Sequence, residues 1–80
     1  MKELLLSDIE NGESVVVQSV KEGSFKIKLV EMGLVEGKIL QVLFRAPLGD
    51  PMAIDVDGYT LSLRKDEAKW ITVLPNKELT

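Results

Sequence analysis

The chain contains no cysteine and no histidine among its 80 residues. Without cysteine there is neither a disulfide framework nor a thiolate zinc site, and without histidine the commonest neutral metal ligand is missing. The serines also lack a histidine that could activate them as nucleophiles. We therefore expect a protein that is not an enzyme and that has no cofactor and no dedicated metal site.

An excess of positive charge is also missing. Lysine and arginine number 10 against 13 aspartates and glutamates, which gives a net charge of -3 and a sequence pI of about 4.9, and only 5% of the residues are aromatic. Proteins that bind phosphate backbones or single strands usually show the opposite balance. Gly33 and Gly37 do not have the spacing of a phosphate-binding loop. We expect no nucleic acid partner and no direct binding of GTP.

Long apolar runs are absent as well. The N-terminus has only three consecutive leucines, and no stretch approaches the roughly 18 apolar residues of a membrane-spanning helix. We expect a cytoplasmic protein without direct membrane insertion. The length predicts one domain over residues 1–80, with a core at about 6–74 and a frayed tail at 75–80.

What the sequence does contain is a series of short apolar, β-branched segments separated by turn residues. Alternating or β-branched residues predict strands, and Lys65 to Lys69 predicts a single helical turn. The predicted strands are 14–21, 38–45, 52–56, 59–64 and 70–74, after an apolar lead-in at 4–9. Five short strands in so small a chain predict a mainly β fold, a small and strongly bent barrel.

The pair Asp57-Gly58 predicts a two-residue type I′ hairpin turn. Such a turn places Val56 opposite Tyr59 and continues the pairing to Met52 and Leu63. Apolar side chains then share one face, and small or polar ones share the other. This register predicts that the ring of Tyr59 points into the core.

The segment from Ser24 to Gly33 has two possible interpretations. Phe25, Ile27 and Leu29 alternate as in a strand, whereas Leu29 and Met32 lie on one face of a helix. We favour a helix of about two turns, with Ser24 as N-cap, because Gly33 stands where a C-terminal glycine belongs.

Three motifs in a fixed order give the chain a resemblance to a known family. They are LVEMGLVEG at 29–37, RAPLGDP at 45–51 and GYTLSLRKDEA at 58–68. Together they resemble the FeoA family, small cytoplasmic proteins of bacterial ferrous iron uptake, and the similarity extends from Leu6 to Val73. One position departs from the pattern: many members have proline before the second glycine, where this chain has Glu36.

The resemblance implies an SH3-like barrel with a short helix after the first strand. It also implies a cytoplasmic accessory or regulatory protein that binds FeoB, a large ferrous iron transporter with a cytoplasmic GTP-binding domain. An alternative is a metal-responsive regulatory domain, since similar domains form the C-terminus of iron-dependent repressors. Small barrels expose strand edges, which leaves weak homo-oligomerisation open.

We predict that the partner binds around the helix end and the proline-flanked loop. The candidate residues are Leu29, Met32, Gly33, Leu34, Leu48 and Asp50. Leu34 and Leu48 are expected to be exposed, so that serine at either position would weaken partner binding with little loss of stability.

A structural interpretation of the same residues stays open. Leu29 and Met32 would then cap the core, and residues 47–51 would form a rigid connector. Phe25 and Trp70 are expected in the core. Arg45 is expected in solvent, together with Lys26, Lys28, Arg64 and Lys65.

Overall fold

The computed structural model describes residues 3–76, which form six strands and three short helical segments. The strands are β1 (Leu4–Leu5), β2 (Ser14–Val20), β3 (Ile39–Arg45), β4 (Met52–Val56), β5 (Tyr59–Leu63) and β6 (Ile71–Pro75). The helical segments are the 3-10 turn η1 (Leu6–Asp8) and the α-helices α1 (Lys26–Glu31) and α2 (Lys65–Ala68).

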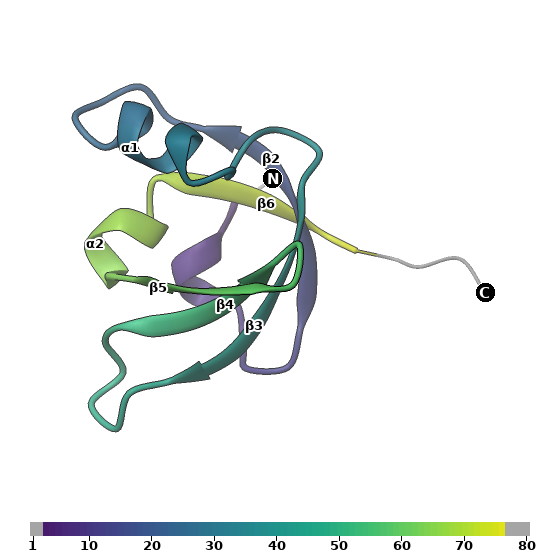
Figure 1. Ribbon diagram of the computed structural model, residues 1–80, viewed down its shortest axis with the longest axis vertical. Helices are drawn as coiled ribbons and strands as arrows, with labels where there is room; N and C mark the ends of the chain where they lie inside the picture. Colours follow the sequence, from purple (N-terminus) through teal and green to yellow (C-terminus); the bar gives the residue numbers. More distant parts are fainter. Residues whose placement is uncertain (1–2, 77–80) are drawn as a thin grey trace.

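All six strands belong to one antiparallel sheet with the order β1-β6-β2-β3-β4-β5. The sheet curls, so that β6 faces β4 and β5 across the interior (Figure 1). The mainly β class is confirmed, and so is the short helix after the strand at 14–20. The two-residue strand β1 lies within the segment that was expected only as an apolar lead-in.

Two irregularities in the strand pairing help the sheet to bend. The register shifts between Val17 and Ser19 in β2, and between Val42 and Phe44 in β3. An extra residue in one strand reverses the direction of the side chains that follow it. Phe44 is therefore 59% exposed, although it lies two residues after the buried Val42.

The hairpin of β4 and β5 has the register that the sequence predicts, with Val56 opposite Tyr59 and Met52 opposite Leu63. Asp57 and Gly58 both have positive φ angles, of 54° and 87°, as a type I′ turn requires. The prediction for the ring of Tyr59 is wrong, because this side chain is 71% exposed. It lies at the end of an edge strand, beyond the packed interior.

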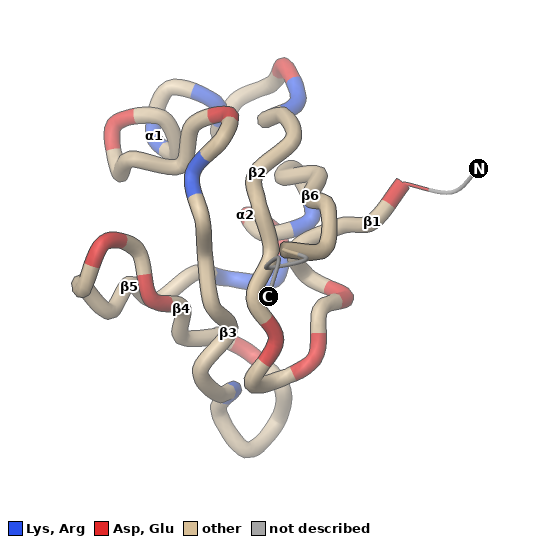
Figure 2. The backbone as a smooth tube through the Cα atoms, turned by 90° about the vertical axis from the view of Figure 1, so that its right-hand side faces the viewer, with Lys and Arg blue, Asp and Glu red and all other residues tan. Residues whose placement is uncertain are grey.

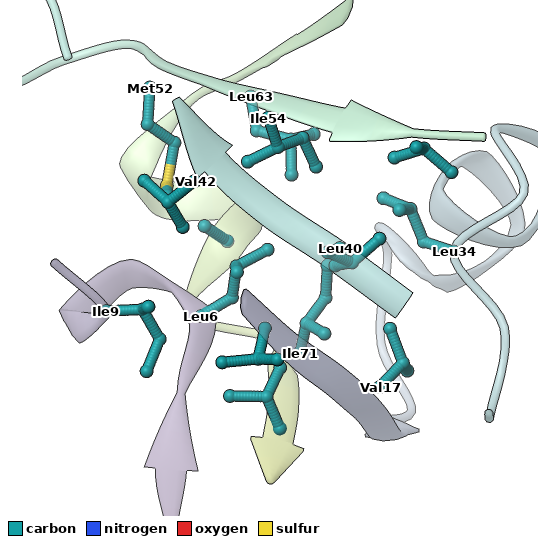
Figure 3. Close-up of a cluster of buried hydrophobic side chains, with 14 of the residues drawn as sticks. Leu6, Ile9, Val17, Leu34, Leu40, Val42, Met52, Ile54, Leu63 and Ile71 are labelled. Carbon is teal, nitrogen blue, oxygen red and sulfur yellow. The ribbon is translucent and has the colours of Figure 1, made fainter. Parts of the chain in front are cut away.

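The core collects side chains from every part of the curled sheet. Leu6 from η1, Leu40 from β3, Ile54 from β4 and Ile71 from β6 point toward one another and are fully buried (Figure 3). Burying one such side chain contributes roughly 1.5–3 kcal/mol. Leu6 thus anchors the N-terminal segment.

Helix α1 is shorter than expected and starts later. Its N-cap is Phe25, not Ser24, and no side chain caps it. Phe25 is half-buried and packs edge-on against Trp70, with ring centroids 6.5 Å apart. Both aromatic residues line the margin of the core rather than its centre.

Arg45 is not a solvated side chain, contrary to expectation. Its guanidinium donates hydrogen bonds to the Asn11 side chain at 2.7 Å and to the backbone carbonyls of Ser7 and Ile9 at 3.1 and 2.6 Å. Arg45 therefore ties the segment between η1 and β2 to the end of β3.

The ordered C-terminal part is also longer than expected. Pro75 belongs to β6, and the Asn76 N–H donates to the Ser14 carbonyl. Residues 77–80 of the expected tail lie outside the described part of the chain. Within residues 3–76, no helix has both the length and the apolar composition needed to cross a membrane.

Candidate functional site

Helix α1 ends just before Gly33. The φ angle of Gly33 is +91°, which is incompatible with continuation of a right-handed helix. The Leu34 N–H donates to the Leu29 carbonyl, and the Gly33 N–H donates to the Val30 carbonyl. This pair of hydrogen bonds is a Schellman motif, in which the residue after the glycine packs against the residue three positions before the C-cap. Leu29 and Leu34 are those two residues, and both are fully buried.

The expectation that Leu34 is exposed is therefore wrong. The sequence contained the signal, because a leucine directly after a helix-ending glycine is typical of the apolar contact in a Schellman motif. Met32 and Gly33 are half-buried. Leu29 and Leu34 lie beneath the surface at this end of the helix and support it.

The outer face of α1 exposes two apolar side chains that the sequence analysis did not select. Ile27 is 74% exposed and Val30 is 39% exposed. Ile27 precedes Leu29 by two residues, about 200° around the helix, so burying Leu29 turns Ile27 outward. Taking Leu29 as the buried position of the helix would have identified Ile27 as an exposed residue from the sequence.

The β3–β4 loop presents Leu48, which is 97% exposed, as expected. Within the loop the Gly49 N–H donates to the Ala46 carbonyl at 2.7 Å, and the Ala46 N–H donates to the Pro51 carbonyl at 3.0 Å. These bonds close the loop on itself and hold an apolar side chain in water.

Asp50 joins this loop to helix α2. Its carboxylate accepts a hydrogen bond from the Lys65 N–H at 2.9 Å, at the first residue of the helix. An acidic group there satisfies a backbone donor that has no partner within the helix. Asp50 thus has a structural role, whatever else it contacts.

Helix α2 is also joined to α1, through a carboxylate that is only 6% exposed. Glu67 accepts hydrogen bonds from the Lys28 ammonium at 2.5 Å and from the Arg64 N–H at 2.9 Å. The ammonium of Lys28 and the Arg64 N–H hold the pKa of Glu67 below its ordinary value, against the opposing effect of burial. Lys28 is 60% exposed, as expected, and it nevertheless forms half of this bridge.

These contacts place α1, α2 and the β3–β4 loop along one side of the molecule, at the left of Figure 1. We call this side the α1–α2–loop face. Its residues are Ile27, Met32, Gly33, Leu48 and Asp50. The structure brings the end of α1 and the β3–β4 loop, the two segments predicted to bind the partner, onto one side with α2 between them. None of the contacts described above joins these two segments directly to each other.

Acidic residues gather elsewhere, around the connection from η1 to β2 (Figure 2). A shallow hollow there is lined by Asp8, Glu10 and Glu13 among others. Within residues 3–76, however, no three acidic side chains come close enough together to hold one metal ion. The carboxylates of this hollow offer no metal centre.

Comparison with known proteins identifies the family. The model of the FeoA domain matches residues 4–75. A protein of Porphyromonas gingivalis, described as an Fe(2+) transport protein A/Fe(2+) transporter FeoB fusion protein, is 38% identical over 69 residues. The match covers 85% of this chain but only 8% of that much longer protein.

Solved structures agree in sequence and in fold. An FeoA-like protein from Clostridium acetobutylicum is 37% identical, with a TM-score of 0.89 over 100% of this chain and 94% of that one. FeoA of Stenotrophomonas maltophilia, solved with zinc and described as an SH3 domain protein, is 29% identical, with a TM-score of 0.76 over 88% of each chain.

A manganese-dependent transcriptional repressor shares the fold alone, at 19% identity and a TM-score of 0.80 over 89% of this chain and 40% of that one. The SH3-like architecture is thus common to proteins of different function. The family match, in contrast, spans nearly all of the described residues. The chain belongs to the FeoA family.

Proposed function

We propose that this protein is a non-enzymatic accessory of bacterial ferrous iron uptake that acts in the cytoplasm and binds the transporter FeoB. In the Porphyromonas gingivalis relative, an FeoA part and an FeoB part are named in one protein. Domains fused in one protein are kept at a high effective concentration, which suits parts that act together. A separate chain of the same family would need a binding surface for the same purpose.

We place that surface on the α1–α2–loop face. The observation that carries this assignment is Leu48, an almost fully exposed leucine on a loop closed by its own backbone hydrogen bonds. Ordering a flexible apolar side chain on binding costs free energy, and a fixed loop reduces that cost. Ile27 offers a second apolar anchor on α1, and an exposed apolar side chain gains most when a partner covers it.

Leu29 and Leu34 belong to this proposal only indirectly. Both are buried, so a partner would not touch them in this conformation. They hold the end of α1, with Met32 and Gly33 at its surface, in the shape that a partner would meet. Asp50 likewise holds the loop against α2.

The test is an amide NMR titration of labelled protein with the soluble cytoplasmic domain of a cognate FeoB, with and without guanine nucleotide. We expect shifts at residues 27–34 and 46–51. Leu48→Ser and Ile27→Ser should each weaken binding about tenfold, as expected for anchor residues. Leu74→Ser is the matched control. Leu74 is also exposed, but it lies near the C-terminal end of β6, whereas α2 precedes the N-terminal end of that strand.

Shifts confined to other surfaces, or an equal loss in Leu74→Ser, would contradict the assigned face. Absence of any shift at high concentration would argue against the soluble domain as the partner. The membrane-embedded part of FeoB, or a third protein, would then have to be tested in its place.

A further inference from the structure

The connection from η1 to β2 contains the dipeptide Asn11-Gly12, and both residues are exposed. The Glu13 N–H donates to the Glu10 carbonyl at 3.1 Å, so residues 10–13 form a β-turn with Asn11 and Gly12 at its centre. Gly12 has a φ of +92°, whereas Asn11 is not among the residues with positive φ. This combination is a type II turn, whose third position favours glycine.

An asparagine that precedes glycine is open to attack on its own side chain. The main-chain nitrogen of the next residue can close a five-membered ring with the asparagine Cγ, and glycine places no side chain in its way. A Cβ at Gly12 would meet no atom within 4 Å, so the surroundings do not crowd this position either. The second asparagine of the chain, Asn76, is followed by lysine, whose side chain hinders the same attack.

Hydrogen bonds hold both reacting groups of this pair in the folded chain. The Gly12 N–H, which carries the attacking nitrogen, donates to the Val42 carbonyl at 2.7 Å. The Asn11 Oδ1, on the carbon that would be attacked, accepts from the Arg45 guanidinium at 2.7 Å. Ring closure requires the nitrogen to lose its proton and to turn from Val42 toward Cγ of Asn11. The turn must therefore first open from β3.

We propose that Asn11 is a site of spontaneous deamidation that is controlled by opening of this turn. The released and deprotonated Gly12 nitrogen attacks Cγ of Asn11. The N–Cγ bond forms, the Cγ–Nδ2 bond breaks, and Nδ2 leaves as ammonia with a proton that balances the one lost by Gly12. Water then opens the cyclic imide. Addition at Cγ gives aspartate with a normal main chain, and addition at the main-chain carbonyl gives isoaspartate. The sum is the hydrolysis of one amide, which needs no oxidant or reductant.

The two products have different consequences for the fold. An aspartate at position 11 keeps an oxygen where Arg45 already donates, and turns that hydrogen bond into an ion pair. It also adds a negative charge within two residues of Glu10 and Glu13, in the acidic connection that Figure 2 shows, and Arg45 offsets this charge. Isoaspartate instead adds one carbon to the main chain inside the turn, which displaces Gly12 from Val42.

The first test follows deamidation of the full chain by peptide mass spectrometry at mildly alkaline pH, for the folded chain and in concentrated urea. Hydrogen exchange of the Gly12 N–H is measured by NMR on the same protein. Because ring closure and exchange need the same opening, we expect the folded state to slow both by the same factor. Asn76 should stay intact over the same period and serves as the internal control.

Three results of this test would overturn the proposal. One is an Asn11 that stays intact even in urea, and another is deamidation of the folded chain as fast as in urea. The third is deamidation that outpaces the opening measured at the Gly12 N–H by more than about tenfold. This comparison uses only the natural chain, so it does not depend on whether a variant folds.

A second test removes the contact with Arg45. Arg45→Gln loses the donor to Asn11 and the donors to the Ser7 and Ile9 carbonyls. We expect deamidation and Gly12 exchange both to accelerate roughly tenfold, as for the loss of one hydrogen bond to a charged group. Slower deamidation would show that the guanidinium activates the amide, and would overturn its role as a restraint.

Arg64→Gln is the matched control for that variant. Arg64 is an exposed arginine, and within residues 3–76 its side chain makes no hydrogen bond to the η1–β2 connection. Both rates should therefore equal those of the natural chain, and equal acceleration in the two variants would overturn the role assigned to Arg45. None of these outcomes bears on FeoB binding, because each is measured on this chain alone.

Discussion

The buried carboxylate of Glu67 accepts two hydrogen bonds, and its ionisation makes the stability of this protein depend on pH. Its pKa is lowered in the folded state, so the folded chain holds the ionised form more strongly than the unfolded chain does. The resulting stabilisation is complete above the ordinary carboxyl range, at about pH 5. It is lost as the pH falls through the lowered pKa.

We therefore predict that Glu67→Gln lowers the free energy of unfolding at pH 7 by about 1.5–3 kcal/mol, the usual contribution of a hydrogen bond to a charged group. The variant should also lose less stability than the natural chain between pH 6 and pH 3, values chosen to span the carboxyl range. Urea unfolding at a series of pH values measures both effects.

Asp66→Asn provides the control for that prediction. Asp66 is the neighbouring acid, exposed to solvent, and its carboxylate lies 3.9 Å from the Lys69 ammonium. Removing its charge should leave the stability at pH 7 nearly unchanged and the slope with pH as in the natural chain. A pH slope that is unaltered by Glu67→Gln would show that other groups govern acid unfolding.

Two leucines that look alike in the sequence should respond very differently to truncation. Leu34 is fully buried, so Leu34→Ala should lower the free energy of unfolding by about 2–5 kcal/mol. Leu48 is exposed, so Leu48→Ala should change it by less than about 0.5 kcal/mol. Chemical denaturation compares the two, and similar losses would mean that the loop packs against the core in solution.

At the scale of the element, the end of α1 depends on the left-handed conformation of Gly33. A Cβ at this position would meet no atom within 4 Å, so only the backbone opposes a substitution. Gly33→Ala should cost about 1–2 kcal/mol, and Gly33→Asn less, because asparagine tolerates this conformation. Thermal unfolding gives the order, and equal losses for both variants would indicate a steric cause.

Elements governed by local chemistry could be predicted from the sequence. The type I′ turn at Asp57-Gly58 fixed the register of the hairpin, and Gly33 fixed the end of the helix. The bulges in β2 and β3 could not be predicted, because they arise from how distant strands fit together. Phe44 illustrates the result, since simple alternation from Val42 would have buried it.

The candidate site was predictable in part for the same reason. The proline-flanked loop correctly indicated an exposed Leu48, whereas Leu34 was misjudged because its partner in the Schellman motif was not considered. The link from Asp50 to α2 joins residues 15 positions apart. The link from Lys28 to Glu67 joins residues 39 positions apart, and no local pattern indicates such pairs.

At the scale of the whole molecule, the described carboxylates lie too far apart to form a metal centre, and the chain has no histidine or cysteine. This bears on the alternative of a metal-responsive regulatory domain. We predict that anaerobic titration with ferrous or manganous ion, followed by Trp70 fluorescence, gives no saturable change below about 1 mM. A saturable response at micromolar concentration would favour the regulatory alternative.

The position of β6 has a consequence for the synthesis of this protein. Residues 71–75 form a strand between β1 and β2, and both neighbours come from the first quarter of the chain. A nascent chain that has emerged from the ribosome only as far as β5 can form its central hairpins, but the gap between β1 and β2 remains unfilled. Pairing of such distant segments must wait until β6 leaves the exit tunnel. The fold can therefore be completed only after β6, the last strand of the domain, has been translated.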